Sequence, residues 1–140
     1  MFHNQPMANI QQAVPFFMVT SMEAALKFYV DGLGFVVTNT WTPHGKIEWC
    51  WLKAGDAAMM LQEYRPGMAK SPLGQGVSVC FMCEDAIAIY HEITARGTEA
   101  KRPFVGNGLW VVSVTDPDGY RIDFESPTTE PEESEYTPTS

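Results

Sequence analysis

The chain repeats one order of structural elements, and this internal duplication constrains its fold more than any other feature. β-Branched and aromatic residues predict a strand at 13–20, a helical spacing follows at 22–30, and three strands are predicted at 35–41, 47–54 and 57–64. The second unit predicts a strand at 77–83, a helix ending at Arg96, and strands near 103–105, 109–115 and 120–125. The offset is about 63 residues when Val14 is aligned with Val77. Each unit has the order βαβββ, which predicts an α+β fold.

Local signals mark the ends of the predicted helices. Ser21 and Asp85 are suitable N-cap residues, because their side-chain oxygens accept hydrogen bonds from the first turn of a helix. Gly32, Gly34 and Gly97 end the two helices. The sequence Asp-Pro-Asp-Gly at 116–119 predicts a tight turn before the last strand.

Two stretches carry a resemblance to a known family. They are VPFFMVTSMEAALKFYVDGLGFVV at 14–37 and VTDPDGYRIDFESP at 114–127. With the duplicated order, they resemble the vicinal oxygen chelate superfamily of glyoxalases, bleomycin resistance proteins and extradiol dioxygenases. The resemblance covers 10–127 and implies one domain of two βαβββ modules, about 10–64 and 76–127, that form a pair of half-barrels around a cleft. Residues 65–75 are predicted to link the modules, and 1–9 and 128–140 to be flexible ends.

Composition and charge exclude several classes of partner. Of 17 acidic residues four lie in the tail (Glu130, Glu132, Glu133 and Glu135), leaving 13 acidic against 9 basic side chains. This balance excludes a basic nucleic-acid face and slightly favours cationic ligands. The longest apolar runs are strand-sized, so no membrane span is predicted, and the N-terminus lacks a secretory signal, so we expect a cytoplasmic protein. Cys80 and Cys83 are expected to point to opposite faces of a strand, as inert thiols.

The resemblance also implies where a metal would bind. In metal-dependent members, His and Glu ligands come from the first and last strands of each module, which match Val14, Leu61, Val77 and Asp123 here. Only Asp123 is a metal ligand by chemistry, so we predict no metal cofactor, as in the metal-independent bleomycin-resistance-like branch. The alternative is a divalent metal at a displaced carboxylate site of Glu63 and Asp123.

Strand alternation gives a list of residues expected to line the cleft. Phe16 and Met18 are predicted to face the cleft, while Phe17 and Val19 pack against the helices. Leu61, Val77 and Asp123 are predicted to lie on the cleft side of their own strands, as Phe16 does. The candidate ligand-binding residues are Phe16, Trp49, Trp51, Leu61, Glu63, Val77, Trp110, Arg121 and Asp123. Trp49 and Trp51 fit either a stacking wall or a core or dimer interface. Arg121, Asp123 and Glu125 fit either a neutralised structural network or a site with a catalytic base.

Three functions remain open. The first is a homodimeric protein that binds a small aromatic or cationic molecule in an apolar cleft without metal. The second is a lyase, isomerase or dioxygenase of the same superfamily, with Glu63 or Asp123 as catalytic base or metal ligand. The third is a silent sensor or partner-binding module. Of the histidines, His44 in a turn is a weak candidate for ligand contact, and His91 lies in the second predicted helix.

Overall fold

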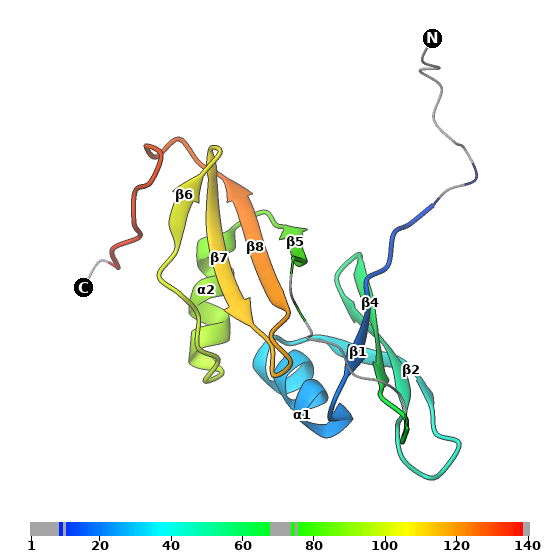
Figure 1. Cartoon of the computed structure of the whole chain (residues 1–140). Helices are drawn as coiled ribbons and strands as arrows, with labels where there is room; N and C mark the ends of the chain where they lie inside the picture. The colour runs from blue at the N-terminus through cyan, green and yellow to red at the C-terminus, as the bar shows by residue number, and fades with distance from the viewer. Residues whose placement is uncertain (1–8, 10, 68–73, 75, 139–140) are drawn as a thin grey trace.

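The fold consists of two four-stranded sheets with the same strand order. The computed structural model describes residues 9, 11–67, 74 and 76–138 (Figure 1). The first sheet has the order β1 (Phe16–Val19), β4 (Ala57–Glu63), β3 (Trp49–Ala54), β2 (Val36–Trp41). The second has the order β5 (Ser78–Met82), β8 (Arg121–Pro127), β7 (Leu109–Thr115), β6 (Phe104–Gly106). In both, the first strand pairs parallel with the last. The predicted duplication and the α+β fold are confirmed.

The helices begin where the capping residues predict. α1 (Met22–Leu26) follows Ser21, whose hydroxyl accepts from the backbone N–H of Ala24 at 3.1 Å. α2 (Ala86–Ala95) follows Asp85, whose carboxylate accepts from Ala88 at 3.0 Å. α1 continues as a π-helical segment, η1 (Lys27–Gly32), which the sequence pattern does not predict. Apolar spacing cannot separate an α from a π turn, because both present neighbouring positions on one face.

Gly32 lets the two modules approach closely at the end of η1. A Cβ built on this glycine would lie 2.7 Å from the hydroxyl oxygen of Thr98. The same hydroxyl donates to the carbonyl of Gly32 at 2.8 Å. A larger residue at position 32 would therefore separate the first module from the loop that follows α2.

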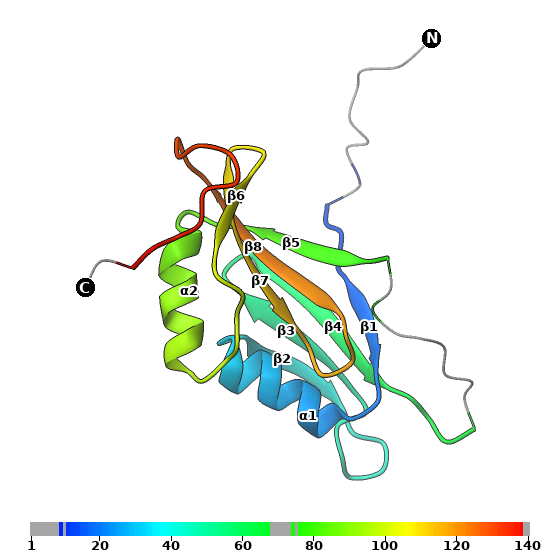
Figure 2. The ribbon, with the colours of Figure 1, turned by 60° about the vertical axis from the view of Figure 1, so that its left-hand side comes forward.

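The inner faces of the two sheets share one hydrophobic core. Phe17 of β1 stacks on Tyr120 at 4.0 Å between ring centroids, and Phe35 meets Phe81 of β5 edge-on at 5.6 Å. Figure 1 shows α1 between the lower ends of the two sheets, and Figure 2 shows α2 along one face of the second sheet. The buried residues that join the modules include Val19, Leu52, Leu61, Val112, Ile122 and Phe124. Each large apolar side chain stabilises the fold by about 1.5–3 kcal/mol.

A buried hydrogen bond ties the 116–119 turn to the first module. The phenol of Tyr29 donates to Asp116 at 2.7 Å, and the other carboxylate oxygen accepts from the backbone of Asp118 and Tyr120, both at 2.9 Å. Burial raises the pKa of Tyr29 and also that of Asp116. The predicted turn therefore also fixes the position of one module against the other.

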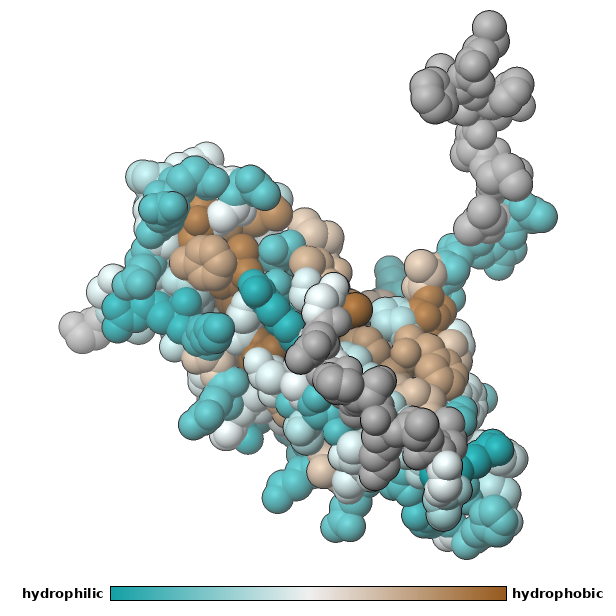
Figure 3. Space-filling model, in the orientation of Figure 1, coloured by the Kyte–Doolittle hydropathy of each residue, from teal (hydrophilic) through white to brown (hydrophobic). Residues whose placement is uncertain are grey.

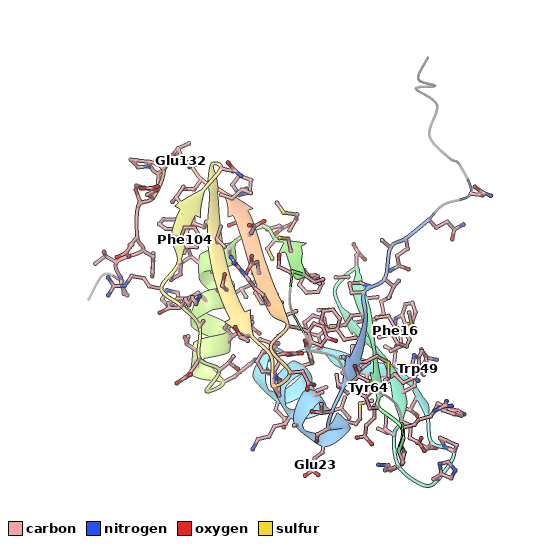
Figure 4. All side chains as sticks on the ribbon, viewed as in Figure 1. Phe16, Glu23, Trp49, Tyr64, Phe104 and Glu132 are labelled. Atoms are coloured by element: carbon pink, nitrogen blue, oxygen red, sulfur yellow. The ribbon has the colours of Figure 1, made fainter. Side chains whose placement is uncertain are left out.

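The C-terminal segment is ordered along β6 as far as it is described, contrary to the prediction of a flexible end. Val105 donates to Ser134 at 2.9 Å, and Tyr136 donates to Pro103 at 2.8 Å. The carboxylate of Glu132 accepts from Asn107 and Gly108, which form the β6–β7 turn (Figure 4). The composition of the tail suggested disorder, but the unpaired backbone groups of an edge strand supply partners that composition does not show.

Two further predictions concern the ends and the membrane. Of the predicted flexible N-terminus at 1–9, all but Asn9 lies outside the described residues. Most of the predicted linker at 65–75 also lies outside them. Within the described part of the chain, no helix has the length and apolar character needed to cross a bilayer.

Candidate functional site

The outer side of the first sheet carries a dense set of aromatic and sulfur-containing side chains. The strand register places Phe16, Met60, Trp51 and Asn39 in one row across the sheet, and Met18, Gln62, Trp49 and Trp41 in the next. We call these eight residues the first outer face. Phe16 and Trp41 are 46% and 44% exposed, which is unusual for such large apolar side chains. Figure 4 shows Phe16 and Trp49 on the side of the sheet away from the second module, and Figure 3 shows brown and pale brown surface gathered there.

The prediction that Leu61 shares this face is wrong. β1 and β4 are parallel partners, with Phe17 beside Leu61 and Phe16 beside Met60. Leu61 therefore lies on the inner side with Phe17, and it is completely buried. Alternation shows which residues share a face, but only the pairing with β1 shows which face of β4 points inward.

Trp41 also belongs to this face, although it was not among the predicted ligand-binding residues. In the antiparallel pair of β2 and β3, Trp41 lies directly opposite Trp49, so the two side chains project from the same face. Trp51 follows Trp49 on that face two residues along β3. The signal available in the sequence was a tryptophan near the end of one predicted strand followed by two more near the start of the next.

The rim of this face, beyond Trp41, contains a pocket of about 410 Å³. Its lining residues include Trp41, His44, Lys46, Glu48, Glu63, Tyr64 and Arg65. The guanidinium carbon of Arg65 lies 5.4 Å from the centre of the Trp41 ring, a cation–π contact. His44 is paired with Glu48 at 2.7 Å, and both residues line the pocket.

The outer side of the second sheet is polar at its centre. Arg121, Asp123 and Glu125 alternate along β8, and we call them, with the neighbouring Ser78, Cys80, Met82, Phe104, Val111, Ser113 and Thr115, the second outer face. Asp123 is only 4% exposed. One of its oxygens accepts from Ser113 Oγ at 2.6 Å and from Arg121 Nε at 3.0 Å. Arg121 also donates to Ser113 at 3.3 Å, which closes a small network.

The residues of β5 that were predicted to face the cleft with Val77 point to the opposite side of the sheet. Val79 pairs with the buried Ile122, and Phe81 with Phe124, so both point into the core instead of toward a cleft. Val77 precedes the strand and is exposed. The residues of β5 on the same side as Asp123 are Ser78, Cys80 and Met82.

Trp110 does not lie with the other tryptophans. It alternates with the inner residues Val112 and Val114 of β7 and packs against the core. Its ring meets Tyr136 of the C-terminal segment edge-on at 5.9 Å. The prediction that groups Trp110 with Trp49 in one site is therefore wrong, because β7 turns this side chain toward α2.

The environment of Glu63 differs from the one expected of a catalytic base. Its carboxylate accepts from the backbone N–H of Met22, at the start of α1, and from Lys46 Nζ, both at 2.7 Å. These two hydrogen bonds lower its pKa, with Lys46 as the larger cause. A lowered pKa argues against the predicted role of Glu63 as a catalytic base, because the two donors hold the carboxylate in its ionised form.

The residues at the family's metal positions do not fit a metal ion. Val14, Leu61 and Val77 have no ligand atoms, and Glu63 and Asp123 are held separately by partners of their own modules. In the described ranges, ligand atoms of Cys80, Asp123 and Glu125 lie within 4.8 Å of one another. Arg121 already supplies the positive charge there, and burial with the two carboxylates raises the pKa of the Cys80 thiol. The predicted displaced site of Glu63 and Asp123 does not form.

The two outer faces do not form one cleft within a single chain. Their opposite sides meet in the shared core through contacts such as Phe17–Tyr120 and Phe35–Phe81. The tryptophans of the first face and Asp123 of the second therefore point away from each other. The cleft predicted between Trp49, Leu61 and Asp123 is absent from the described chain.

Comparison with known proteins identifies the family. The model of the glyoxalase/bleomycin resistance protein/dioxygenase superfamily matches residues 10–124. The chain belongs to this superfamily. No match was found among curated proteins. The matched residues span both βαβββ modules and end in β8.

Solved structures share the fold at low sequence identity. A bleomycin-binding protein in complex with bleomycin has a TM-score of 0.67 and 21% identity, covering 85% of this chain and 100% of its own. A bleomycin resistance determinant encoded on transposon Tn5 has a TM-score of 0.67 and 22% identity, with 84% and 98% covered. TnmS3, an antibiotic-binding protein from Streptomyces sp. CB03234, has a TM-score of 0.63 and 25% identity, with the same coverages.

Proposed function

We propose that this superfamily member binds a small aromatic or cationic organic molecule on the first outer face, without a metal ion. The observation that carries the proposal is the exposed Trp41 together with the half-buried Trp49 and Trp51 on the same face, beside Phe16 and two methionines. Exposed apolar surface of this kind is a common feature of ligand and partner sites. Two of the similar structures are described as binding bleomycin or an antibiotic, which supports the same kind of ligand here.

A homodimer would complete the site. Because the two outer faces of one chain point away from each other, a second copy can bring its own second outer face over the tryptophans. Such an arrangement would enclose a ligand between an aromatic face and the Arg121–Asp123 network, with Glu125 beside it. Enclosure would remove most of the ligand's apolar surface from water, the main source of affinity for such molecules.

Within this proposal, Asp123 and Arg121 act as a neutralised pair on the wall of the site. Asp123 is buried and uses one oxygen for two donors, so its loss would leave Arg121 and Ser113 without their shared acceptor. Phe16, Trp49 and Trp51 remain proposed ligand contacts, and Arg121 and Asp123 proposed contacts at the wall. Leu61 and Trp110 are left out of the site because both side chains belong to the core side.

Calorimetric titration with bleomycin prepared free of metal tests the proposal. We expect saturable binding that weakens about tenfold in Trp49→Leu, because loss of a stacking ring removes both contact area and ring interactions. Trp110→Phe is the matched control and should bind like the natural chain, since Trp110 packs against Tyr136. If bleomycin and the planar cations described below all fail to bind, the proposed function is wrong.

Elemental analysis tests the absence of metal chemistry. The protein, purified without chelators and then titrated with zinc, nickel, manganese and iron, is expected to hold none of them in stoichiometric amount. The physical reason is that Asp123 is already paired with Arg121, whose positive charge opposes a metal ion at this group. A tight one-to-one site for any of these metals would favour the enzymatic alternative instead.

A further inference from the structure

We propose that Trp41, Trp49 and Trp51 form one continuous stacking surface that selects planar cations of three or more fused aromatic rings. The inference rests on the proposed function and names the ligand class that the first outer face would take. It assigns Trp41 the role of the specificity-determining residue, because this ring extends the surface beyond a two-tryptophan platform.

The strand register places the three tryptophans at neighbouring positions on one face of the sheet. Trp41 and Trp49 are direct cross-strand partners, and such pairs have Cβ atoms about 4.5–5.5 Å apart. Trp49 and Trp51 are two residues apart on β3, which separates their Cα atoms by about 6.7 Å. An indole ring is large enough to bridge spacings of this size, so the three rings can present one apolar surface at a corner of the sheet.

The hydrophobic core does not include these rings. The first sheet packs against the core with its other side, through Phe17, Leu52 and Leu61. Trp41 is 44% exposed and lies on the edge strand of the sheet. A buried tryptophan side chain would stabilise the fold, and the exposed part of Trp41 does not make this contribution. A binding role explains the exposure of Trp41, whereas a packing role explains Trp110.

An arginine already occupies the face of the outermost ring. The guanidinium carbon of Arg65 lies 5.4 Å from the centre of the Trp41 ring. Guanidinium is a planar cation that stacks on aromatic faces. The contact shows that the Trp41 ring accepts a flat, positively charged group, and the adjoining pocket of about 410 Å³ gives room for such a group at the rim.

The charge of the chain favours a cationic ligand over an anionic one. The formal net charge is −8 at pH 7, and this field attracts cations to the surface. On the second outer face Arg121 is paired with Asp123, while Glu125 has no ion pair among the residues that the structure describes. If a second copy covers the tryptophans, Glu125 adds a negative charge to the enclosed site.

The spacing of the indoles determines how many fused rings a ligand needs in order to contact two of them. A single six-membered ring covers one indole only, because the neighbouring tryptophans begin about 5–7 Å away. Three fused rings extend from one indole to the next and bury apolar surface against both. We therefore expect affinity to rise with ring number and the last increment to depend on Trp41.

A series of cations with one constant charge tests this selection. N-methylpyridinium, N-methylquinolinium and N-methylacridinium have one, two and three rings and are titrated by calorimetry against the full chain. We expect N-methylacridinium to bind at least about tenfold more tightly than N-methylpyridinium. Trp41→Leu should weaken N-methylacridinium binding about fivefold and leave N-methylpyridinium unchanged. Trp110→Phe is the matched control and should change neither.

The outcomes separate this inference from the proposed function. Equal affinity for the three cations, or an unchanged N-methylacridinium affinity in Trp41→Leu, would overturn the selection by ring number while bleomycin binding still stands. Loss of binding in Trp41→Leu accompanied by a change of oligomeric state would also overturn it, because the ring would then serve a dimer interface. Circular dichroism and sedimentation of each variant provide these readings.

Discussion

At the scale of single residues, the most informative group is the carboxylate of Asp116 in the 116–119 turn. Tyr29→Phe removes its phenol donor and leaves a buried carboxylate with fewer hydrogen bonds. We expect the free energy of unfolding at pH 7 to fall by about 1–3 kcal/mol. Urea denaturation followed by tryptophan fluorescence gives this value. A loss below about 0.5 kcal/mol would mean that the bond contributes little.

The pH dependence of this effect has a definite sign. Burial raises the pKa of Asp116 in the folded protein, while the Tyr29 hydrogen bond acts against that rise. A raised carboxyl pKa contributes stability below the ordinary value of about 3.9, and this stability is lost as pH rises through the folded pKa. Since phenylalanine cannot stabilise the ionised form, the deficit of Tyr29→Phe should be largest at neutral pH and shrink on acidification.

Glu63 gives a second residue-scale prediction of opposite sign. Its pKa is lowered by Lys46 and by the Met22 N–H, so its contribution is present above about 4.3 and is lost as pH falls through the folded pKa. Glu63→Gln should reduce stability by about 1 kcal/mol at pH 7 and by less near pH 3. Glu48→Gln is the control, because its partner His44 is mostly exposed and such pairs contribute little. Equal deficits at both pH values would contradict the assigned cause.

At the scale of elements, the C-terminal segment acts as an additional edge for the second sheet. Removing residues 130–140 deletes the backbone hydrogen bonds to β6 and the aromatic contacts of Tyr136 with Trp110 and His91. We expect a loss of about 2 kcal/mol in stability and a red shift of tryptophan emission. Tyr136→Phe, which keeps the ring and loses its hydrogen bond to His91, should show only a small part of this loss. An unchanged truncated protein would mean that the segment docks without stabilising the fold.

Elements also differ in how well sequence predicts them. The capping residues Ser21 and Asp85 and the turn at 116–119 act locally, so the starts of both helices and the last hairpin agree with prediction. The faces of β4 and β5 were assigned to the wrong side. Their burial depends on the strands beside them, and alternation is symmetric between the two faces of a strand.

At the scale of the whole molecule, the arrangement of the modules determines what a site can contain. One chain has a shared core and two outer faces, so the predicted enclosed cleft needs a second copy. We expect light scattering to give twice the chain mass of 15.6 kDa. Met82→Lys places a charge on exposed apolar surface of the second outer face and should shift the protein toward monomer. Glu23→Lys, on α1, is the charge-altering control, and a natural chain that stays monomeric at high concentration would contradict the dimer.

The sequence by itself determined the duplicated βαβββ order, the helix starts, the final turn and the aliphatic residues at three of the four positions where the family's metal ligands lie. Each of these depends on side-chain chemistry or on contacts between near neighbours in the chain. Only the tertiary structure decided that Leu61 is core, that Glu63 holds the start of α1, and that Trp41 adjoins Trp49. The reason is that sheet register and the contacts between modules join residues far apart in sequence, and these contacts decide which side of each strand meets water.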